Sequence, residues 1–120
     1  GRVYAYVPKH TLRVFVEQVD YVTGFGFPPG GLAARRALGI PGRGPQKVFS
    51  NLAVLAFDPA TGLMGLESIH AGVSLDQVQA STSFDLPIPD PILTTAPPSA
   101  EEVRLMREEI DPRGLRKHRF

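Results

Sequence analysis

The chain has 120 residues, enough for one domain that buries about two thirds of the surface exposed by its unfolded chain. Its apolar fraction of 42% is typical of a globular protein, and no apolar run reaches the ~18 residues that a membrane span requires. Thirteen Lys and Arg against twelve Asp and Glu leave no basic excess of the kind that binds nucleic acid or membranes.

No cysteine is present, which excludes disulfides, thiolate catalysis and cysteine-based zinc sites. No apolar segment follows a basic start as a signal peptide would, so the sequence predicts a cytoplasmic location. The expected partners are proteins or small molecules.

The chain enters an apolar run, Val3–Val7, almost at once, and Pro8 ends it by removing a backbone donor. This pattern predicts a buried strand. Because the strand starts so close to Gly1, we expect a further segment upstream. Residues 12–22 alternate less cleanly, and they are compatible with either a strand or an irregular extended segment.

Loops rich in glycine and proline are predicted at residues 24–31 and 42–45, on either side of a short helix at 32–38. Residues 47–57 are almost continuously apolar, which predicts a strand buried on both faces of a sheet. Turn residues follow at 58–62, and residues 63–69 are predicted to return as the partner strand of a hairpin.

Capping boxes, formed by Ser74 with Gln77 and by Ser99 with Glu102, predict a short helix after residue 74 and a terminal helix at 100–110. Residues 84–88 are predicted to form another short strand. Five prolines between residues 87 and 98 make the intervening segment an extended arm. The predicted organisation is a single domain, 1–120, with a proline-rich arm at 89–98 and a terminal helix at 99–111.

Two phosphate-binding motifs are absent. A P-loop needs Lys and then Ser or Thr directly after its last glycine, whereas Gly44 is followed by Pro45 and Gln46. Gly24 and Gly26 lead into prolines rather than into a helix N-terminus that could hold a pyrophosphate. These glycines are interpreted as turn residues.

The three histidines lie far apart, and none has a second histidine at helical metal-ligand spacing, so no metal site is predicted. His10 and Thr11 follow the first predicted strand, and ligands bind at the carboxyl ends of strands in open α/β sheets. They are the candidates for substrate-facing residues, with a hydrogen-bonded or exposed loop histidine as the alternative for His10. For His70 we predict a structural role, with its ring bonded to backbone.

Charged groups near the C-terminus suggest chemistry but have simpler explanations. Four carboxylates lie in the terminal helix, where the first two face the positive end of the helix dipole and are explained by capping: Glu101, Glu102, Glu108 and Glu109. Asp58, before Pro59, is predicted to bond to local backbone rather than to act as a general base. A basic tail, predicted to be a solvated terminus rather than an anion site, contains Arg113, Arg116, Lys117, His118 and Arg119.

The order of several short motifs resembles one family over residues 1–116. It is carried by the strand ending at His10 and Thr11, by 15–17 with Asp20 and Thr23, by 51–54 leading to 57–58, by 66–70 with 72–73, by Val78, Thr82 and Phe84, by Thr94 and Thr95, and by 109–112. The chain resembles the C-terminal half of the β subunit of type I coenzyme A transferases, closest to the glutaconate CoA-transferase group. It departs from the family pattern at Ala71, Ser83 and Asn51.

This resemblance implies an α/β fold: the C-terminal part of an open, mostly parallel CoA-transferase-like sheet with flanking helices and a strand hairpin. It implies a CoA thioester as substrate, no permanently bound cofactor, and partners in an α subunit and the upstream half of the β subunit. In the family, a glutamate attacks the acyl-CoA and forms a glutamyl-CoA thioester, which divides a difficult exchange into easier covalent steps. That glutamate lies in a glycine-rich motif upstream of the matching region, so no catalytic residue is assigned here.

Three functional hypotheses follow from the sequence. The first is a β-subunit portion of a CoA-transferase-like enzyme, inactive alone, which supplies scaffold and subunit interface. The second is a noncatalytic interaction module. The third is a subunit of a CoA-thioester hydrolase that opens carbocyclic rings, as some relatives do in steroid breakdown.

Overall fold

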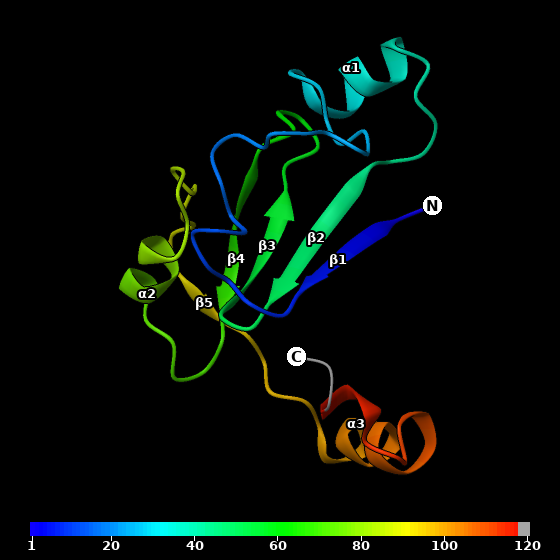
Figure 1. Cartoon of the computed structure of the whole chain (residues 1–120), viewed down its shortest axis with the longest axis vertical. Helices are drawn as coiled ribbons and strands as arrows, with labels where there is room; N and C mark the ends of the chain where they lie inside the picture. The colour runs from blue at the N-terminus through cyan, green and yellow to red at the C-terminus, as the bar shows by residue number, and fades with distance from the viewer. Residues whose placement is uncertain (118–120) are drawn as a thin grey trace.

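A five-stranded sheet forms the centre of the computed structural model, which describes residues 1–117 (Figure 1). The strands lie in chain order, β1-β2-β3-β4-β5. Their bounds are Val3–Val7 for β1, Pro45–Ser50 for β2, Ala53–Phe57 for β3, Met64–Ile69 for β4 and Leu93–Thr94 for β5. The α/β class and the predicted hairpin, now β3 and β4, are confirmed.

Strand directions are mixed within this sheet. β1 runs parallel to β2 and β4 parallel to β5, whereas β3 is antiparallel to both of its neighbours. The sheet of the described residues is therefore mixed rather than mostly parallel. As a result β1, β2, β4 and β5 all point the same way, and their carboxyl ends lie at one edge.

The single strand predicted at 47–57 is wrong, because the chain reverses at Asn51 and Leu52 to form β2 and β3. Ser50 makes the reversal possible: its Oγ accepts hydrogen bonds from the backbone N–H groups of Leu52 at 3.2 Å and Ala53 at 3.1 Å. A hydroxyl that satisfies two turn amides is a local signal that apolar periodicity does not contain.

β1 is a strand as predicted, but its predicted burial is wrong. It is an edge strand with one neighbour, and Val3, Tyr4 and Tyr6 are 55%, 52% and 63% exposed. Of the two alternatives for residues 12–22, the structure has the irregular one, with turns and bends and no strand. This segment nevertheless places Phe15 in the core.

The strand predicted at 84–88 is also wrong. Pro87 and Pro89 lack backbone donors, so this stretch cannot form a regular ladder. It makes a single sheet-like contact, in which the Leu66 N–H donates to the Pro87 carbonyl at 2.8 Å. The edge position beside β4 is taken instead by β5.

Three α-helices match the predicted positions: α1 at Gly31–Ala37, α2 at Leu75–Ala80 and α3 at Ala100–Leu105. Ser74 caps α2 by accepting from the Gln77 N–H, and Ser99 with Glu102 forms a complete capping box on α3. The terminal helix continues as a π-helical segment, η1, at Met106–Ile110, and a 3₁₀ turn, η2, follows at Leu115–Lys117.

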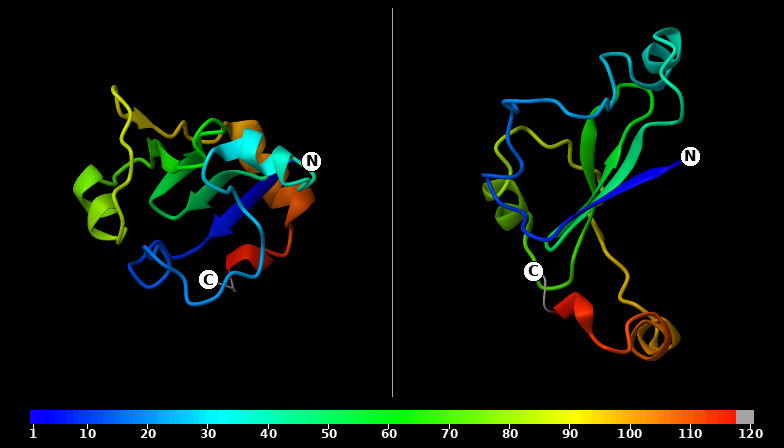
Figure 2. Two further views of the ribbon diagram at one scale, coloured as in Figure 1. Left: turned by 90° about the horizontal axis from the view of Figure 1, so that it is seen from above. Right: turned by 45° about the vertical axis from the view of Figure 1, so that its right-hand side comes forward.

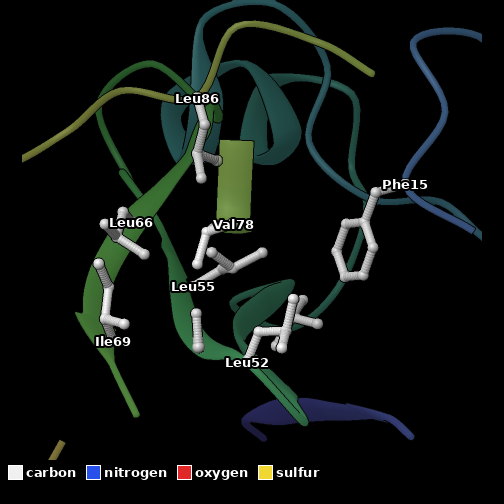
Figure 3. Packing of buried hydrophobic residues seen from close by; sticks show 9 residues of the cluster. Phe15, Leu52, Leu55, Leu66, Ile69, Val78 and Leu86 are labelled. Atoms are coloured by element: carbon white, nitrogen blue, oxygen red, sulfur yellow. The ribbon is translucent and has the colours of Figure 1, made fainter. Parts of the chain in front are cut away.

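The core lies on one face of the sheet, beneath α2 and the long connection between β1 and α1 (Figure 2). Figure 3 shows Val78 of α2 beside Leu55 at the centre of the cluster, with Phe15 of the connection on one side and Leu66 of the sheet on the other. Leu55 and Val78 are fully buried. Burial of such side chains contributes about 1.5–3 kcal/mol each, which fixes α2 on the sheet.

The terminal helix stands apart from the sheet, at the end of the extended arm (Figure 1). None of the side chains of α3 or η1 is buried. The radius of gyration is 16.2 Å, compared with about 14 Å for a compact domain of this length. Among residues 1–117, no helix is long and apolar enough to cross a bilayer.

Candidate functional site: a strand-end cluster of histidines and hydroxyls

Polar side chains gather where the four co-directional strands end. His10 follows β1, Ser50 ends β2, and His70 follows β4. Val7 pairs with Ser50 across β1 and β2, so the segments that leave these strands start side by side. We call the hydrogen-bonded group at this edge the strand-end cluster, made of His10, Ser50, Ser68, His70, Thr82 and Thr95.

His10 is the most buried member, with 3% of its surface exposed. Its Nδ1 lies 2.8 Å from Ser50 Oγ and its Nε2 lies 2.8 Å from Thr82 Oγ1. Its backbone N–H donates to Asn51 Oδ1 at 2.8 Å, and its ring stacks on Phe15 with centroids 3.9 Å apart. Every polar atom of the ring therefore has a partner inside the protein.

The surrounding bonds assign one protonation state to His10. The Thr82 hydroxyl donates to the Val78 carbonyl at 2.8 Å, so its oxygen accepts the Nε2–H of His10. Ser50 Oγ already accepts two backbone N–H groups, and its single proton can go to Nδ1 at 2.8 Å or to the Ala53 carbonyl at 3.2 Å; Nδ1 is the nearer acceptor. The ring is neutral, in agreement with burial, which lowers the pKa of His10.

His70 joins the same cluster from the other side of Ser50. Its Nε2 donates to the Ser50 carbonyl at 2.9 Å, which is the predicted bond to backbone. Its Nδ1 lies 2.9 Å from Thr95 Oγ1, which in turn lies 2.7 Å from Ser68 Oγ. The cluster thus links the ends of β1, β2, β4 and β5 and the C-terminal end of α2.

This arrangement suits positioning rather than proton transfer. Both ring nitrogens of each histidine are occupied, and Ser50, Ser68 and Thr82 are buried. His10 lies inside the protein and Thr11, next to it, is exposed. Whether the corner formed by His10 and Thr11 faces substrate stays a prediction.

Sequence reasoning did not single out the hydroxyl residues Ser50, Ser68 and Thr95 as members of a site. A signal was present: Ser50 and Ser68 interrupt apolar runs directly at strand ends, where a polar side chain would be buried without a partner. Which histidine each hydroxyl contacts could not be predicted without the order of the strands in the sheet, because that order determines which strand ends are neighbours.

The carboxylates of the terminal helix have the local roles expected of them. Arg104 forms ion pairs with Glu101 at 2.8 Å, Glu109 at 3.1 Å and Glu108 at 3.3 Å. The Arg104 guanidinium lowers the pKa of Glu101, and the backbone N–H of Ser99 lowers the pKa of Glu102. All four are exposed; Glu102 caps the helix, and the other three pair with Arg104.

Two other predictions near turns can be compared with the structure. Asp58 Oδ1 accepts from the Ala60 N–H at 2.8 Å, so the predicted backbone role is confirmed. Part of the basic tail is ordered, because Arg116 pairs with Asp111 at 2.6 Å. His118 and Arg119 lie outside the described residues. Within residues 1–117, no group of three or more His, Asp or Glu side chains could hold a metal ion.

No protein-family model matches the chain, but individual relatives do. The chain is 39% identical over 114 residues to the IpdB subunit of the cholesterol ring-cleaving hydrolase of Rhodococcus jostii RHA1, covering 92% of this chain and 43% of that subunit. It is 39% identical over 107 residues to the B subunit of glutaconate CoA-transferase of Acidaminococcus fermentans, covering 87% of this chain and 39% of that subunit.

Solved structures of both relatives share the fold. The crystal structure of R. jostii IpdAB matches with a TM-score of 0.78 and 37% identity, over 98% of this chain and 46% of that chain. The glutaconate CoA-transferase structure matches with a TM-score of 0.75 and 34% identity, over 91% of this chain and 41% of that chain. The chain spans about two fifths of the length of its curated relatives, which fits the C-terminal half expected from the sequence. It is therefore homologous to part of the B subunits of CoA-transferases and of IpdB.

Proposed function

We propose that this chain is the B-subunit portion of a CoA-transferase-like enzyme that acts on acyl-CoA thioesters, and that it supplies scaffold and subunit interface. The observation that carries the proposal is the match to two CoA-transferase-type B subunits, at 39% identity and with the same fold. A cytoplasmic location and the absence of a permanently bound cofactor belong to the same proposal.

The proposed nucleophile is a glutamate outside these residues. The glutamates of the chain have other uses: Glu67 pairs with Lys47 at 2.8 Å, and the four in the terminal helix cap it or pair with Arg104. Glu17 lies exposed in the irregular segment. Glu17 lines a shallow pocket together with Gln79 and Asp85, and its side chain is exposed there.

The strand-end cluster has a proposed role in this enzyme. It holds the turn that carries exposed Thr11 at a fixed position beside the carboxyl ends of the strands, the edge where α/β sheets bind ligands. We place His10 as a positioning residue and Thr11 at the edge of the acyl-CoA pocket.

The proposed partners are an α-type subunit and the remaining part of the β subunit. Their support is the apolar surface that the chain does not cover itself. Val103, Met106 and Ile110 form a stripe on the free-standing terminal helix, with Ile110 69% exposed. We assign this stripe to the α-type subunit, because the helix has no packing partner in its own sheet and the solved relative IpdAB has two components.

The experiment is an exchange assay. The full-length B-type protein, co-expressed with its α-type partner, is incubated with an acyl-CoA and an isotopically labelled free acid. The expected product is the CoA thioester of the labelled acid. If CoA moves to no acceptor among a panel of mono- and dicarboxylic acids, the transferase proposal fails.

A ring-opening hydrolase is the second candidate, and the 39% identity to IpdB favours it specifically. Such an enzyme would convert cyclic acyl-CoA thioesters to ring-opened acids without any acceptor acid. The same preparation tests it by mass spectrometry of the products in the absence of acceptor. A noncatalytic interaction module would give neither product and would have no glutamate- and glycine-rich stretch upstream in its reading frame.

A further inference from the structure

A second candidate site lies at the opposite end of the sheet from the strand-end cluster. There α1, the start of β2 and the end of β3 border a half-open cavity of about 430 Å³. This volume is in the range of small-ligand sites, roughly 300–1,000 Å³. We call it the α1 pocket; its lining includes Phe27, Arg36, Arg43, Lys47 and Phe57.

The α1 pocket is strongly electropositive for a chain with a formal net charge of +1. Three cations line it, and no Asp or Glu is among the lining residues. Lys47 is partly neutralised by Glu67, with Nζ 2.8 Å from Oε1. Arg36 and Arg43 are exposed and have no ion pair with any residue of 1–117, so both guanidinium groups are available to an anion.

Arg35 adds a buried positive charge beside this pocket. It is 8% exposed, and it donates to the carbonyls of Phe25 at 3.0 Å, Gly26 at 2.7 Å and Pro41 at 2.8 Å, with a longer contact to Gly42. These bonds fix the loop that carries Arg43. No carboxylate is among its partners, so its charge strengthens the local positive potential.

Aromatic side chains form the apolar wall. The rings of Phe27 and Phe57 have centroids 5.9 Å apart and are tilted by 48°. Phe27 is packed closely against two glycines. A Cβ added at Gly44 would lie 3.1 Å from the Phe27 ring, and a Cβ added at Gly62 would lie 2.7 Å from the Cβ of Phe27. A rigid aromatic surface next to guanidinium groups can bind a nucleotide, with the planar base on the rings and the phosphates on the guanidinium groups.

We propose that the α1 pocket binds a phosphorylated nucleoside, with Arg36 and Arg43 on the phosphate groups and the base against Phe27 and Phe57. This deepens the proposed function and rests on it where the ligand is the nucleotide end of a CoA thioester. A free nucleoside phosphate offers the same chemistry and is the other source of ligand.

The test uses the full-length protein in complex with its α-type partner. Isothermal titration measures the affinity for CoA, for adenosine 3′,5′-bisphosphate and for unphosphorylated adenosine. The double variant Arg36→Gln with Arg43→Gln removes both charges, and Arg113→Gln is the control, because Arg113 is an exposed arginine of the tail that does not line the pocket. Surface substitutions of this kind leave folding almost unchanged.

The expected result is a loss of affinity for the bisphosphate of about tenfold or more in the double variant, since charge-assisted hydrogen bonds are lost. Adenosine binding and the Arg113→Gln protein should be unaffected. An equal loss for CoA identifies the CoA thioester as the source, and an unchanged CoA affinity identifies a free nucleotide. No bisphosphate binding by the wild type, or the same affinity in the double variant, overturns the proposal.

These outcomes separate this inference from the proposed function. If the complex binds CoA through Arg36 and Arg43 but shows neither exchange nor hydrolysis, the α1 pocket proposal is supported and the proposed enzymatic function is contradicted. If the complex exchanges CoA, and the double variant binds CoA and the bisphosphate as tightly as the wild type does, the proposed function is supported and the α1 pocket proposal is contradicted.

Discussion

At the scale of single residues, the two described histidines illustrate how a reactive side chain becomes a structural one. His10 and His70 both bond to Ser50, one to its hydroxyl and the other to its carbonyl. Because each ring also has a threonine partner, neither nitrogen is left for an incoming ligand. The hydrogen bonds of the cluster therefore hold the strand ends in a fixed geometry.

Substitution of Thr82 by valine should destabilise the protein by about 1–3 kcal/mol, because it leaves the buried Nε2–H of His10 without an acceptor. Thr82→Ser, which keeps the hydroxyl, should retain most of the stability. Urea unfolding of the purified proteins measures both. Equal unfolding midpoints for wild type and Thr82→Val would show that this bond is not formed.

Stability should also depend on pH through His10. Burial lowers the pKa of His10 in the folded protein, whereas the unfolded chain has the ordinary value of roughly 6.5. Below that pH the unfolded state binds a proton that the folded state does not, so the free energy of unfolding falls as the pH falls. Above that pH the stabilising contribution of neutral His10 is retained in full.

Urea unfolding at pH 7.5 and pH 5.5 measures this dependence. In His10→Gln, which cannot titrate, the difference between the two pH values should be smaller than in the wild type. A difference of the same size in both proteins would assign it to other groups.

At the scale of elements, the sequence predicted helix starts and the hairpin correctly, because the signal for each lies within a few neighbouring residues. Ser74 and Ser99 marked helix starts, and the turn at 58–62 marked the hairpin. Apolar content alone failed at 47–57, because it does not distinguish one long strand from two joined by a tight turn. The buried partner of His10 was inaccessible from sequence, since Thr82 lies 72 residues away.

The start of α1 gives a prediction for backbone geometry. Gly31 has φ +63°, and an added Cβ would collide with the Pro59 carbonyl, to which the Leu32 N–H also donates at 2.8 Å. Gly39 has a similar φ of +71° with open space around it. Gly39→Ala should cost about 1–2 kcal/mol for the left-handed conformation alone.

Gly31→Ala should cost clearly more, because the clash adds to the same backbone strain. Urea unfolding of the two variants side by side measures the difference. Equal losses would mean that α1 moves away from the turn between β3 and β4 without penalty.

The terminal helix gives a prediction for assembly. Ile110 is exposed in this chain, so Ile110→Gln should leave its stability almost unchanged. If the α-type subunit covers this side chain, the substitution should weaken subunit association about tenfold or more, since burial of an isoleucine contributes about 1.5–3 kcal/mol.

Glu108→Gln is the matched control, because Glu108 pairs with Arg104 on the other side of the helix. Analytical ultracentrifugation of the mixed subunits measures both variants. Equal association constants for Ile110→Gln and wild type would place the stripe outside the subunit interface.

At the scale of the whole molecule, the chain leaves much of its apolar surface uncovered. Among residues 1–117, seventeen large hydrophobic side chains are exposed and ten hydrophobic residues are buried. The edge strand β1 and the terminal helix contribute several of the exposed ones. Sequence reasoning predicted β1 to be buried because its composition suits a covered strand. Such exposure fits a chain homologous to about two fifths of larger subunits, and we propose that the rest of the assembly covers it.

The central claim is that these residues form a scaffold whose attacking carboxylate lies elsewhere. The most direct measurement compares acyl-CoA turnover by the 120-residue chain alone with turnover by the full-length protein joined to its α-type subunit. The account predicts CoA exchange or thioester hydrolysis by the complex and none by the chain alone. Turnover by the purified 120-residue chain would contradict it.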